Sequence, residues 1–141
     1  MKRYFLFLFV TIAALACKKD DPETQINKIA GTWELAAREE LAEGKNVWVD
    51  VSQTNPEVLV FREDGDLIDV TGLPICCAPR SLSIDGNVVK IAPKQNVLYS
   101  AMCMYVNCVY CETWGIETHG DEIIVSYCGM SRTRYIRKDG I

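Results

Sequence analysis

The chain has 141 residues, a formal net charge of −4 and 24% charged residues, and 49% of its residues are hydrophobic. This length suits one domain with a core of its own. The acidic balance argues against nucleic acid as a partner, because phosphate binding needs a positive surface, and basic residues gather only just after residue 17 and in the last predicted strand.

The N-terminal residues have the pattern of a cleaved secretory signal. Lys2 and Arg3 precede an apolar run over residues 4–16, which has about 13 residues where a membrane-spanning helix needs about 20. Small residues and then Cys17 follow, as at a processing site. We therefore expect a signal peptide over 1–16 and a mature chain of 141 − 16 = 125 residues.

The start of the mature chain is polar and contains Pro22. This composition predicts a flexible tether over residues 17–27. The folded domain is then expected over residues 28–141.

Short strands and tight turns are predicted along the rest of the chain. Residues 81–84 and 113–117 alternate polar with apolar residues, which indicates half-buried strands, and Asp-Gly pairs such as Asp85-Gly86 are strong hairpin signals. Local hairpins of this kind favour an all-β fold, an antiparallel up-and-down barrel of about 8–10 strands. The predicted strands are 32–39, 46–51, 57–63, 66–71, 80–85, 87–92, 97–105, 110–118, 122–128 and 131–138.

Two hairpins have registers that can be tested within the sequence. Two-residue loops at Asp64-Gly65 and His119-Gly120 would each place apolar residues opposite one another on one face. The predicted opposed pairs are Phe61 with Ile68, Leu59 with Val70, Ile116 with Ile123, and Trp114 with Val125.

Six cysteines follow Cys17, and an even set in an oxidising compartment predicts disulfides. The second hairpin places Cys111 directly opposite Cys128, at a separation that a disulfide tolerates, so we predict that bond. A bond between the neighbours Cys76 and Cys77 would be strained. These two are therefore expected to reach separately to Cys103 and Cys108, with the pairing left open.

Two other functions of the cysteines, redox catalysis and zinc binding, have less support in the sequence. Cys108 and Cys111 have the spacing of a redox motif, but no βαβ pattern or helix start accompanies them. Four thiolates, including Cys103 and Cys128, have the right chemistry for zinc, although oxidation would compete outside the cytoplasm.

No catalytic constellation is evident. The single histidine, His119, lies in a predicted turn, and the acidic clusters near residues 39–43 and 63–69 are typical of solvated hairpin ends. We expect no enzymatic activity, no cofactor and no metal site.

The segment Ala14-Leu15-Ala16-Cys17 resembles the lipobox of bacterial lipoproteins. The resemblance implies a diacylglyceryl thioether on Cys17 and a further acyl chain, such as palmitate, on the new amine. The residue directly after Cys17 is Lys18 and not Asp. In this respect the chain resembles lipoproteins that are transported to the outer membrane. The stretch 18–21 also resembles the surface-export tag of Bacteroidetes lipoproteins, so attachment at the cell surface or on the periplasmic face remains open.

The folded part resembles the small lipocalin-like lipoproteins of Bacteroidetes over about residues 26–138. The likeness rests on Gly31-Thr32-Trp33 and on the order and spacing of three later segments. These are Phe61-Arg62-Glu63-Asp64-Gly65, Ile84-Asp85-Gly86-Asn87-Val88-Val89 and Thr133-Arg134-Tyr135-Ile136-Arg137.

The lipocalin resemblance implies roles for particular residues. Trp33 would seal the closed end of the barrel with Arg134 packed over it, and Arg132 and Arg137 are the alternatives. The open end is expected to bind a small apolar ligand. The expected ligand-lining residues are Trp48, Tyr99 and Tyr105.

A solid barrel that serves as a protein-interaction or structural module is the other reading. A deep cavity lined by those aromatic residues would favour the ligand. A filled interior with an exposed apolar patch would favour the interaction module.

Overall fold

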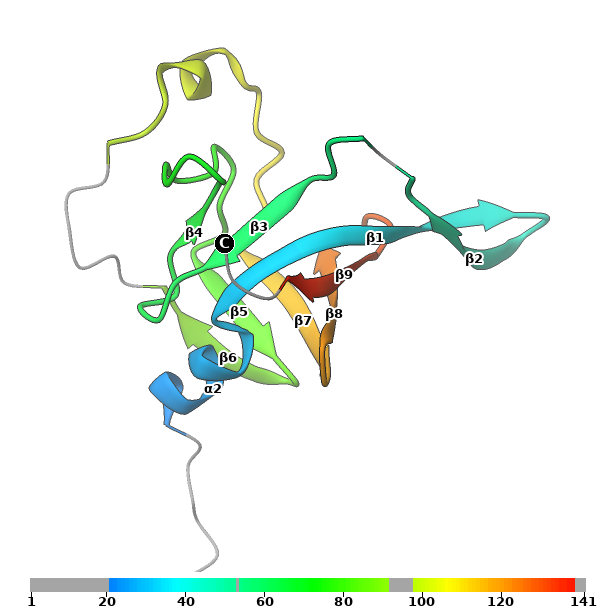
Figure 1. The fold of residues 1–141 in the computed structure, drawn as a ribbon, viewed down its shortest axis with the longest axis horizontal. Helices are drawn as coiled ribbons and strands as arrows, with labels where there is room; N and C mark the ends of the chain where they lie inside the picture. Colours follow the sequence, from blue (N-terminus) through cyan, green and yellow to red (C-terminus); the bar gives the residue numbers. More distant parts are fainter. Residues whose placement is uncertain (1–20, 53, 92–97, 139–141) are drawn as a thin grey trace, which may run out of the picture.

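A computed structural model describes residues 21–52, 54–91 and 98–138 of the chain. They form a nine-stranded sheet that curls into a half-barrel, with a short helix at one end (Figure 1). The predicted all-β class is confirmed. The expected signal peptide over 1–16 and the lipidation site Cys17 lie outside the described residues.

The elements are short apart from the first strand. Their bounds are α2 Pro22–Ile29, β1 Gly31–Ala42, β2 Lys45–Asp50, β3 Val58–Phe61, β4 Leu67–Ile68, β5 Ser81–Ile84, β6 Asn87–Lys90, a 3-10 helix η1 Ala101–Tyr105, β7 Thr113–His119, β8 Glu122–Tyr127 and β9 Thr133–Lys138.

The strand order is β4-β3-β1-β9-β8-β7-β5-β6, with β2 paired to β1. Every pair is antiparallel except β5 and β7, which run parallel. The prediction of a purely up-and-down meander is therefore wrong at this step. The chain between β6 and β7 is long, so it can return β7 to the edge of β5 in the same direction, which a two-residue hairpin cannot do.

Strand β1 connects the two halves of the sheet. One of its edges pairs first with β3 and then with β2, and the other pairs with β9. The β9 register shifts between Leu35 and Ala37, and such a bulge bends a strand. The far end of β1 leaves the half-barrel and forms a projecting hairpin with β2 (Figure 1).

The Asp85-Gly86 hairpin forms as predicted, with both loop residues at positive φ (48° and 84°) and Ile84 paired to Asn87. The Asp64-Gly65 hairpin is one residue out of the predicted register, because its loop has three residues and Gly65 takes the left-handed conformation (φ 87°). Phe61 consequently pairs with Leu67 instead of Ile68.

The slip in this first hairpin changes which residues are buried. Leu67 lies in the core, and Val70, which was expected opposite Leu59, is 67% exposed.

The hairpin after β7 turns at Gly120 and Asp121, one position later than predicted. Ile116 therefore pairs with Val125 instead of Ile123, and Trp114 pairs with Tyr127. A shift of two in the partner keeps the same face inward, so the predicted residues are buried although their partners differ.

Two other segments differ from prediction. The expected strand over 97–105 does not form in residues 98–105, where residues 98–100 have no regular structure and 101–105 form the 3-10 helix η1, capped by the Ser100 hydroxyl; residue 97 lies outside the described residues. The expected tether is helical from Pro22, with Asp21 as N-cap and Pro22 at the first helical position. The folded domain thus begins about six residues before the predicted boundary at 28.

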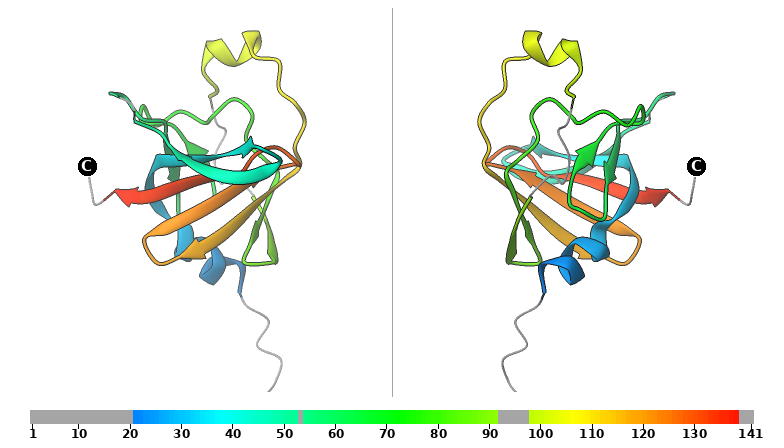
Figure 2. Two further views of the ribbon diagram at one scale, coloured as in Figure 1. Left: turned by 90° about the vertical axis from the view of Figure 1, so that its right-hand side faces the viewer. Right: turned by 90° about the vertical axis from the view of Figure 1, so that its left-hand side faces the viewer.

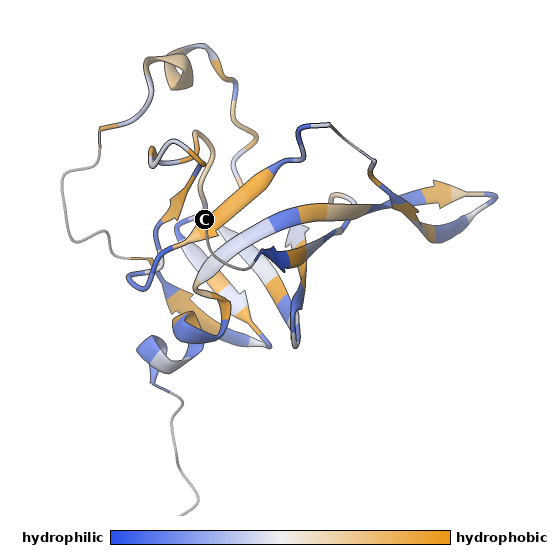
Figure 3. Ribbon diagram, viewed as in Figure 1, coloured by the Kyte–Doolittle hydropathy of each residue, from blue (hydrophilic) through white to orange (hydrophobic). Residues whose placement is uncertain are grey.

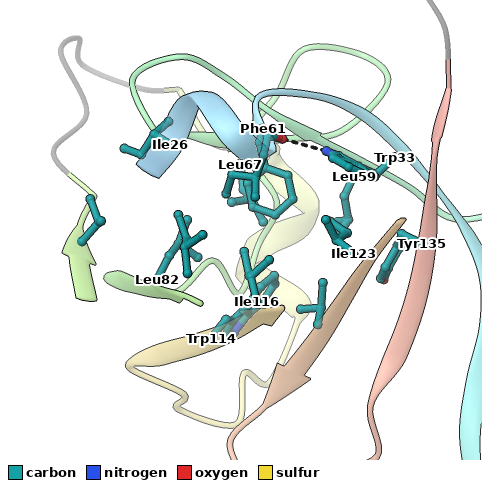
Figure 4. Packing of buried hydrophobic residues seen from close by; sticks show 14 of the residues in the cluster. Ile26, Trp33, Leu59, Phe61, Leu67, Leu82, Trp114, Ile116, Ile123 and Tyr135 are labelled. Carbon is teal, nitrogen blue, oxygen red and sulfur yellow. Dashed lines mark hydrogen bonds between the residues drawn. The ribbon is translucent and has the colours of Figure 1, made fainter. Parts of the chain in front are cut away.

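The interior of the half-barrel is filled by large side chains (Figure 4). Helix α2 covers one end and contributes buried Gln25, Ile26 and Ile29. The largest fully buried apolar side chains are Trp33, Tyr135, Phe61, Ile29, Leu82, Ile84, Ile116, Ile123 and Val125.

Candidate functional site

The end of the half-barrel under α2 is sealed by Trp33, which is fully buried. Its indole Nε1 donates to the Ile29 carbonyl at 2.7 Å (Figure 4). The guanidinium of Arg137 stacks over the ring at 4.2 Å from its centroid and donates to the carbonyls of Ala30 and Lys28. Arg137 thereby supplies hydrogen bonds to carbonyl groups at the end of α2 and covers one face of the Trp33 ring.

Arg137, and not Arg134, is the partner of Trp33. Along β9 the inward positions are Thr133, Tyr135 and Arg137, and the intervening residues face outward. Arg134 lies on the outer side, where it pairs with Asp50 at 3.2 Å. Side chains two residues apart in a strand lie on the same face, so Thr133, Tyr135 and Arg137 share the inward face. This period of two is the sequence signal that could have selected Arg137.

The three residues expected to line a ligand cavity lie apart from each other. Trp48, on the projecting β2, lies near Arg132 and Arg134, whose guanidinium carbons are 5.6 and 5.7 Å from its ring centroid. Tyr99 and Tyr105 are 62% and 87% exposed on the long segment before β7. The structure therefore gives no shared ligand cavity for these three side chains.

Three disulfides link the six cysteines beyond Cys17. They are Cys76–Cys103, Cys77–Cys108 and Cys111–Cys128. The adjacent cysteines 76 and 77 reach separately to the long segment, as predicted, so the zinc and free-thiol alternatives have no thiolates to use.

The Cys111–Cys128 bond forms, but not between directly opposed strand residues. Cys111 precedes β7 and Cys128 follows β8, and the observed register would instead align Cys111 with Met130. Cys128 has a positive φ of 34°, and the Met130 amide donates to the Tyr127 carbonyl, so the chain turns back at Cys128 toward Cys111.

The disulfide-bonded segment over residues 98–111, here called the apolar arm, is the main exposed apolar feature. Its 14 residues include no Asp, Glu, Lys, Arg or His. The arm stands at the end of the molecule opposite α2 in both views of Figure 2, and Figure 3 shows its apolar character. The exposed large side chains of the arm are Leu98, Tyr99, Met102, Met104, Tyr105, Val106, Val109 and Tyr110.

A second feature is a chain of hydroxyl groups that ends on a carboxylate. Tyr135 donates to Glu57 at 2.9 Å, and the hydroxyls of Tyr127 and Tyr135 are 2.9 Å apart. Thr133 lies 3.4 Å from the Tyr127 oxygen, and Arg38 donates to the other oxygen of Glu57 at 3.2 Å. The five residues come from β1, β8, β9 and the segment before β3, and they border an open pocket.

The pKa values of the two tyrosines in this chain of hydroxyl groups are raised, so their hydroxyls stay protonated to a higher pH than usual. Burial is the main cause that raises the pKa of Tyr135 far above its ordinary value, and the neighbouring Tyr127 and Glu57 add to it. Burial likewise raises the pKa of Tyr127. Nearby, the side-chain hydrogen bond from Arg132 lowers the pKa of Glu39. The sequence did not reveal these contacts, because they join strands that are distant in the chain.

Within the described ranges, no group of three or more His, Cys, Asp or Glu side chains is placed to hold a metal ion. None of the helices in that part of the chain has the length and apolar character needed to span a membrane. Comparison with protein-family models, with curated proteins and with solved structures finds no match to this chain.

Proposed function

We propose that this protein is a non-catalytic, lipid-anchored lipoprotein of the outer membrane that binds another protein of the cell envelope through the apolar arm. The observation that carries this proposal is the combination of a filled interior with an uncharged, exposed arm. Aromatic and Met side chains with few charges are typical of the buried centre of protein interfaces. Exposed apolar patches of this kind mark interaction sites.

The position of the apolar arm argues that it binds a protein and not the membrane that holds the lipid anchor. Only four residues separate Cys17 from α2, so a lipid at Cys17 would hold the α2 end close to the bilayer. The arm stands at the opposite end (Figure 2). An anchored molecule would thus present the arm away from its own membrane.

A lipocalin-like origin is part of the proposal. The Gly31-x-Trp33 start of β1 and the arginine stacked on Trp33 support it. The parallel pairing of β5 with β7 and the disulfide-bonded arm are departures from that barrel.

Site-specific photocrosslinking in the native host tests the arm. A photoreactive residue at Val109 is expected to crosslink one protein, and the same residue at Val88, equally apolar and 67% exposed but on β6, is not. Met102→Ser with Tyr105→Ser should abolish the Val109 adduct, while Val88→Ser should leave it. Adducts to lipid alone, or the same adducts from both positions, would contradict the proposal.

The anchor is tested separately. The mature protein extracted from its host should carry the mass of the acyl chains, and Cys17→Ser should remove that mass and release the protein from the membrane fraction. An unmodified Cys17 in the native protein would refute the anchor and leave the arm experiment valid.

A further inference from the structure

We propose that the pocket beside the hydroxyl chain binds a small organic ammonium ion with an apolar body. The pocket has a volume of about 480 Å³ and lies between β1, the segment before β3 and the turn from β8 to β9. Small-molecule sites have volumes of about 300–1,000 Å³. The site is separate from the apolar arm, so this inference does not depend on the proposed protein partner.

The direction of the hydrogen bonds leaves the pocket lined by oxygen atoms that can accept hydrogen bonds from a ligand. Tyr135 gives its only hydroxyl proton to Glu57, so its oxygen must accept the proton of Tyr127. Both phenolic protons thus point along the chain toward the carboxylate. Arg38 donates to the same carboxylate. Glu57 still has lone pairs available, and a ligand that donates hydrogen bonds satisfies them.

The charge around the pocket favours a cation. Glu39 is held by Arg132 through two contacts of 2.8 and 3.1 Å, and Glu57 is paired with Arg38. Glu40, also at the pocket, adds one further carboxylate, so three carboxylates face two guanidinium groups. The excess negative charge is that of Glu40, which borders the same pocket as Glu57, so a ligand ammonium group can pair with a carboxylate there.

Part of the remaining wall is apolar, and its aromatic ring is packed against the body of the fold. The ring of Tyr127 borders the pocket together with Met130. Trp114 packs edge-to-face on Tyr127 with centroids 4.6 Å apart, and the adjacent Cys128 is covalently bonded to Cys111. A neutral phenol ring held in this way can contact both an ammonium group and an apolar body.

Isothermal titration of the full mature chain with 2-phenylethylamine tests this assignment. The amine is expected to bind saturably and at least about tenfold more tightly than 2-phenylethanol, which has the same ring without the charge. Phenylacetate, with the opposite charge, is expected not to bind. Equal affinity for amine and alcohol, or no amine binding at millimolar concentration, would overturn the proposal.

Variants assign the binding to the pocket. Glu57→Gln should weaken amine binding by about tenfold or more, because Glu57 is the carboxylate on which the hydroxyl chain ends, and Glu40→Gln should weaken it by about threefold. Glu63→Gln, an exposed carboxylate in the β3–β4 loop, is the matched control and should leave the affinity unchanged. Unaltered affinity in folded Glu57→Gln or Glu40→Gln protein would place the amine elsewhere and refute this site.

Discussion

Arg137 shows how one side chain can join three parts of this fold. It lies on the last strand, stacks on Trp33 of the first strand and donates to two carbonyls at the end of α2. Its nearest counterpart in the sequence, Arg134, has an exposed ion pair with Asp50. The two arginines have the same chemistry and are both half-buried, but they differ in their contacts, so they form a matched pair for mutation.

Arg137→Ala is expected to lower the free energy of unfolding by about 2–4 kcal/mol, because a close cation–π contact and two charge-assisted hydrogen bonds are lost together. Arg134→Ala should cost less than about 1 kcal/mol, as is typical of exposed ion pairs. Urea unfolding of both variants measures the difference. The reverse order would mean that Arg134 supports Trp33 after all.

The raised pKa of Tyr135 predicts that the folded protein loses stability at alkaline pH. The raised pKa keeps Tyr135 protonated in the folded protein, whereas tyrosine in the unfolded chain ionises near pH 10. Above that pH the unfolded state binds fewer protons, so the free energy of unfolding should fall by about 1.4 kcal/mol per pH unit for Tyr135. Tyr127, whose pKa is also raised, acts in the same direction.

Urea unfolding between pH 8 and pH 11.5 checks this slope. Tyr135→Phe should be less stable at pH 8, because its hydrogen bonds to Glu57 and Tyr127 are lost, and should show a shallower decline above pH 10. The control Tyr99→Phe removes an exposed hydroxyl from the arm and should retain the wild-type slope. Parallel curves for wild type and Tyr135→Phe would be inconsistent with the prediction.

At the level of elements, the disulfides divide into two kinds. Cys111–Cys128 joins the ends of β7 and β8, which belong to the sheet. Cys76–Cys103 and Cys77–Cys108 instead bind the arm to the loop after β4. The first should contribute to the stability of the half-barrel, and the other two to the order of the arm.

Cys111→Ser with Cys128→Ser is expected to lower the free energy of unfolding by about 2–4 kcal/mol, since it releases a loop with a sequence separation of 17. Thermal unfolding followed by circular dichroism measures this loss. Cys77→Ser with Cys108→Ser should instead speed proteolytic cleavage within residues 98–110 under conditions where the half-barrel stays folded. Equal effects of both double variants on the sheet would remove the distinction.

Local pattern predicted most strands but not their partners. Alternation identified β5 and β7, the His119-Gly120 hairpin indicated β8, and Asp85-Gly86 specified its own hairpin. The Asp64-Gly65 register depended on whether the loop has two or three residues, which the same sequence allows. The parallel β5–β7 pair and the hydroxyl chain depend on contacts between distant segments, and these leave no periodic signal in one sequence.

For the whole molecule, the main consequence is that the half-barrel includes α2. The helix buries Ile26 and Ile29, supplies the acceptor for Trp33 and receives the hydrogen bonds of Arg137. Polarity and Pro22 suggested a tether, because the two isoleucines that face the core are separated by polar residues and the helix has only eight residues. Packing, and not intrinsic propensity, stabilises a helix of this length.

A chain that begins at residue 28 is therefore expected to lose about 1.5–3 kcal/mol relative to one that begins at residue 21, from the lost burial of Ile26 alone. Such a loss is a large part of the stability of a typical domain. Chemical unfolding of the two chains measures it. Equal stability would show that residues 22–27 are a tether, as the sequence had suggested.

The bonds from Cys76 and Cys77 also close a covalent ring. The six residues from Cys103 to Cys108, together with the adjacent Cys76 and Cys77, make an eight-residue macrocycle whose apex is Met104-Tyr105-Val106. A peptidase that cuts the arm on either side of this ring cannot release the apex, because two sulfur–sulfur bonds still attach it to the body. The surface by which we propose this protein recognises its partner would thus survive nicking, and the ring is small enough to be made as a cyclic peptide.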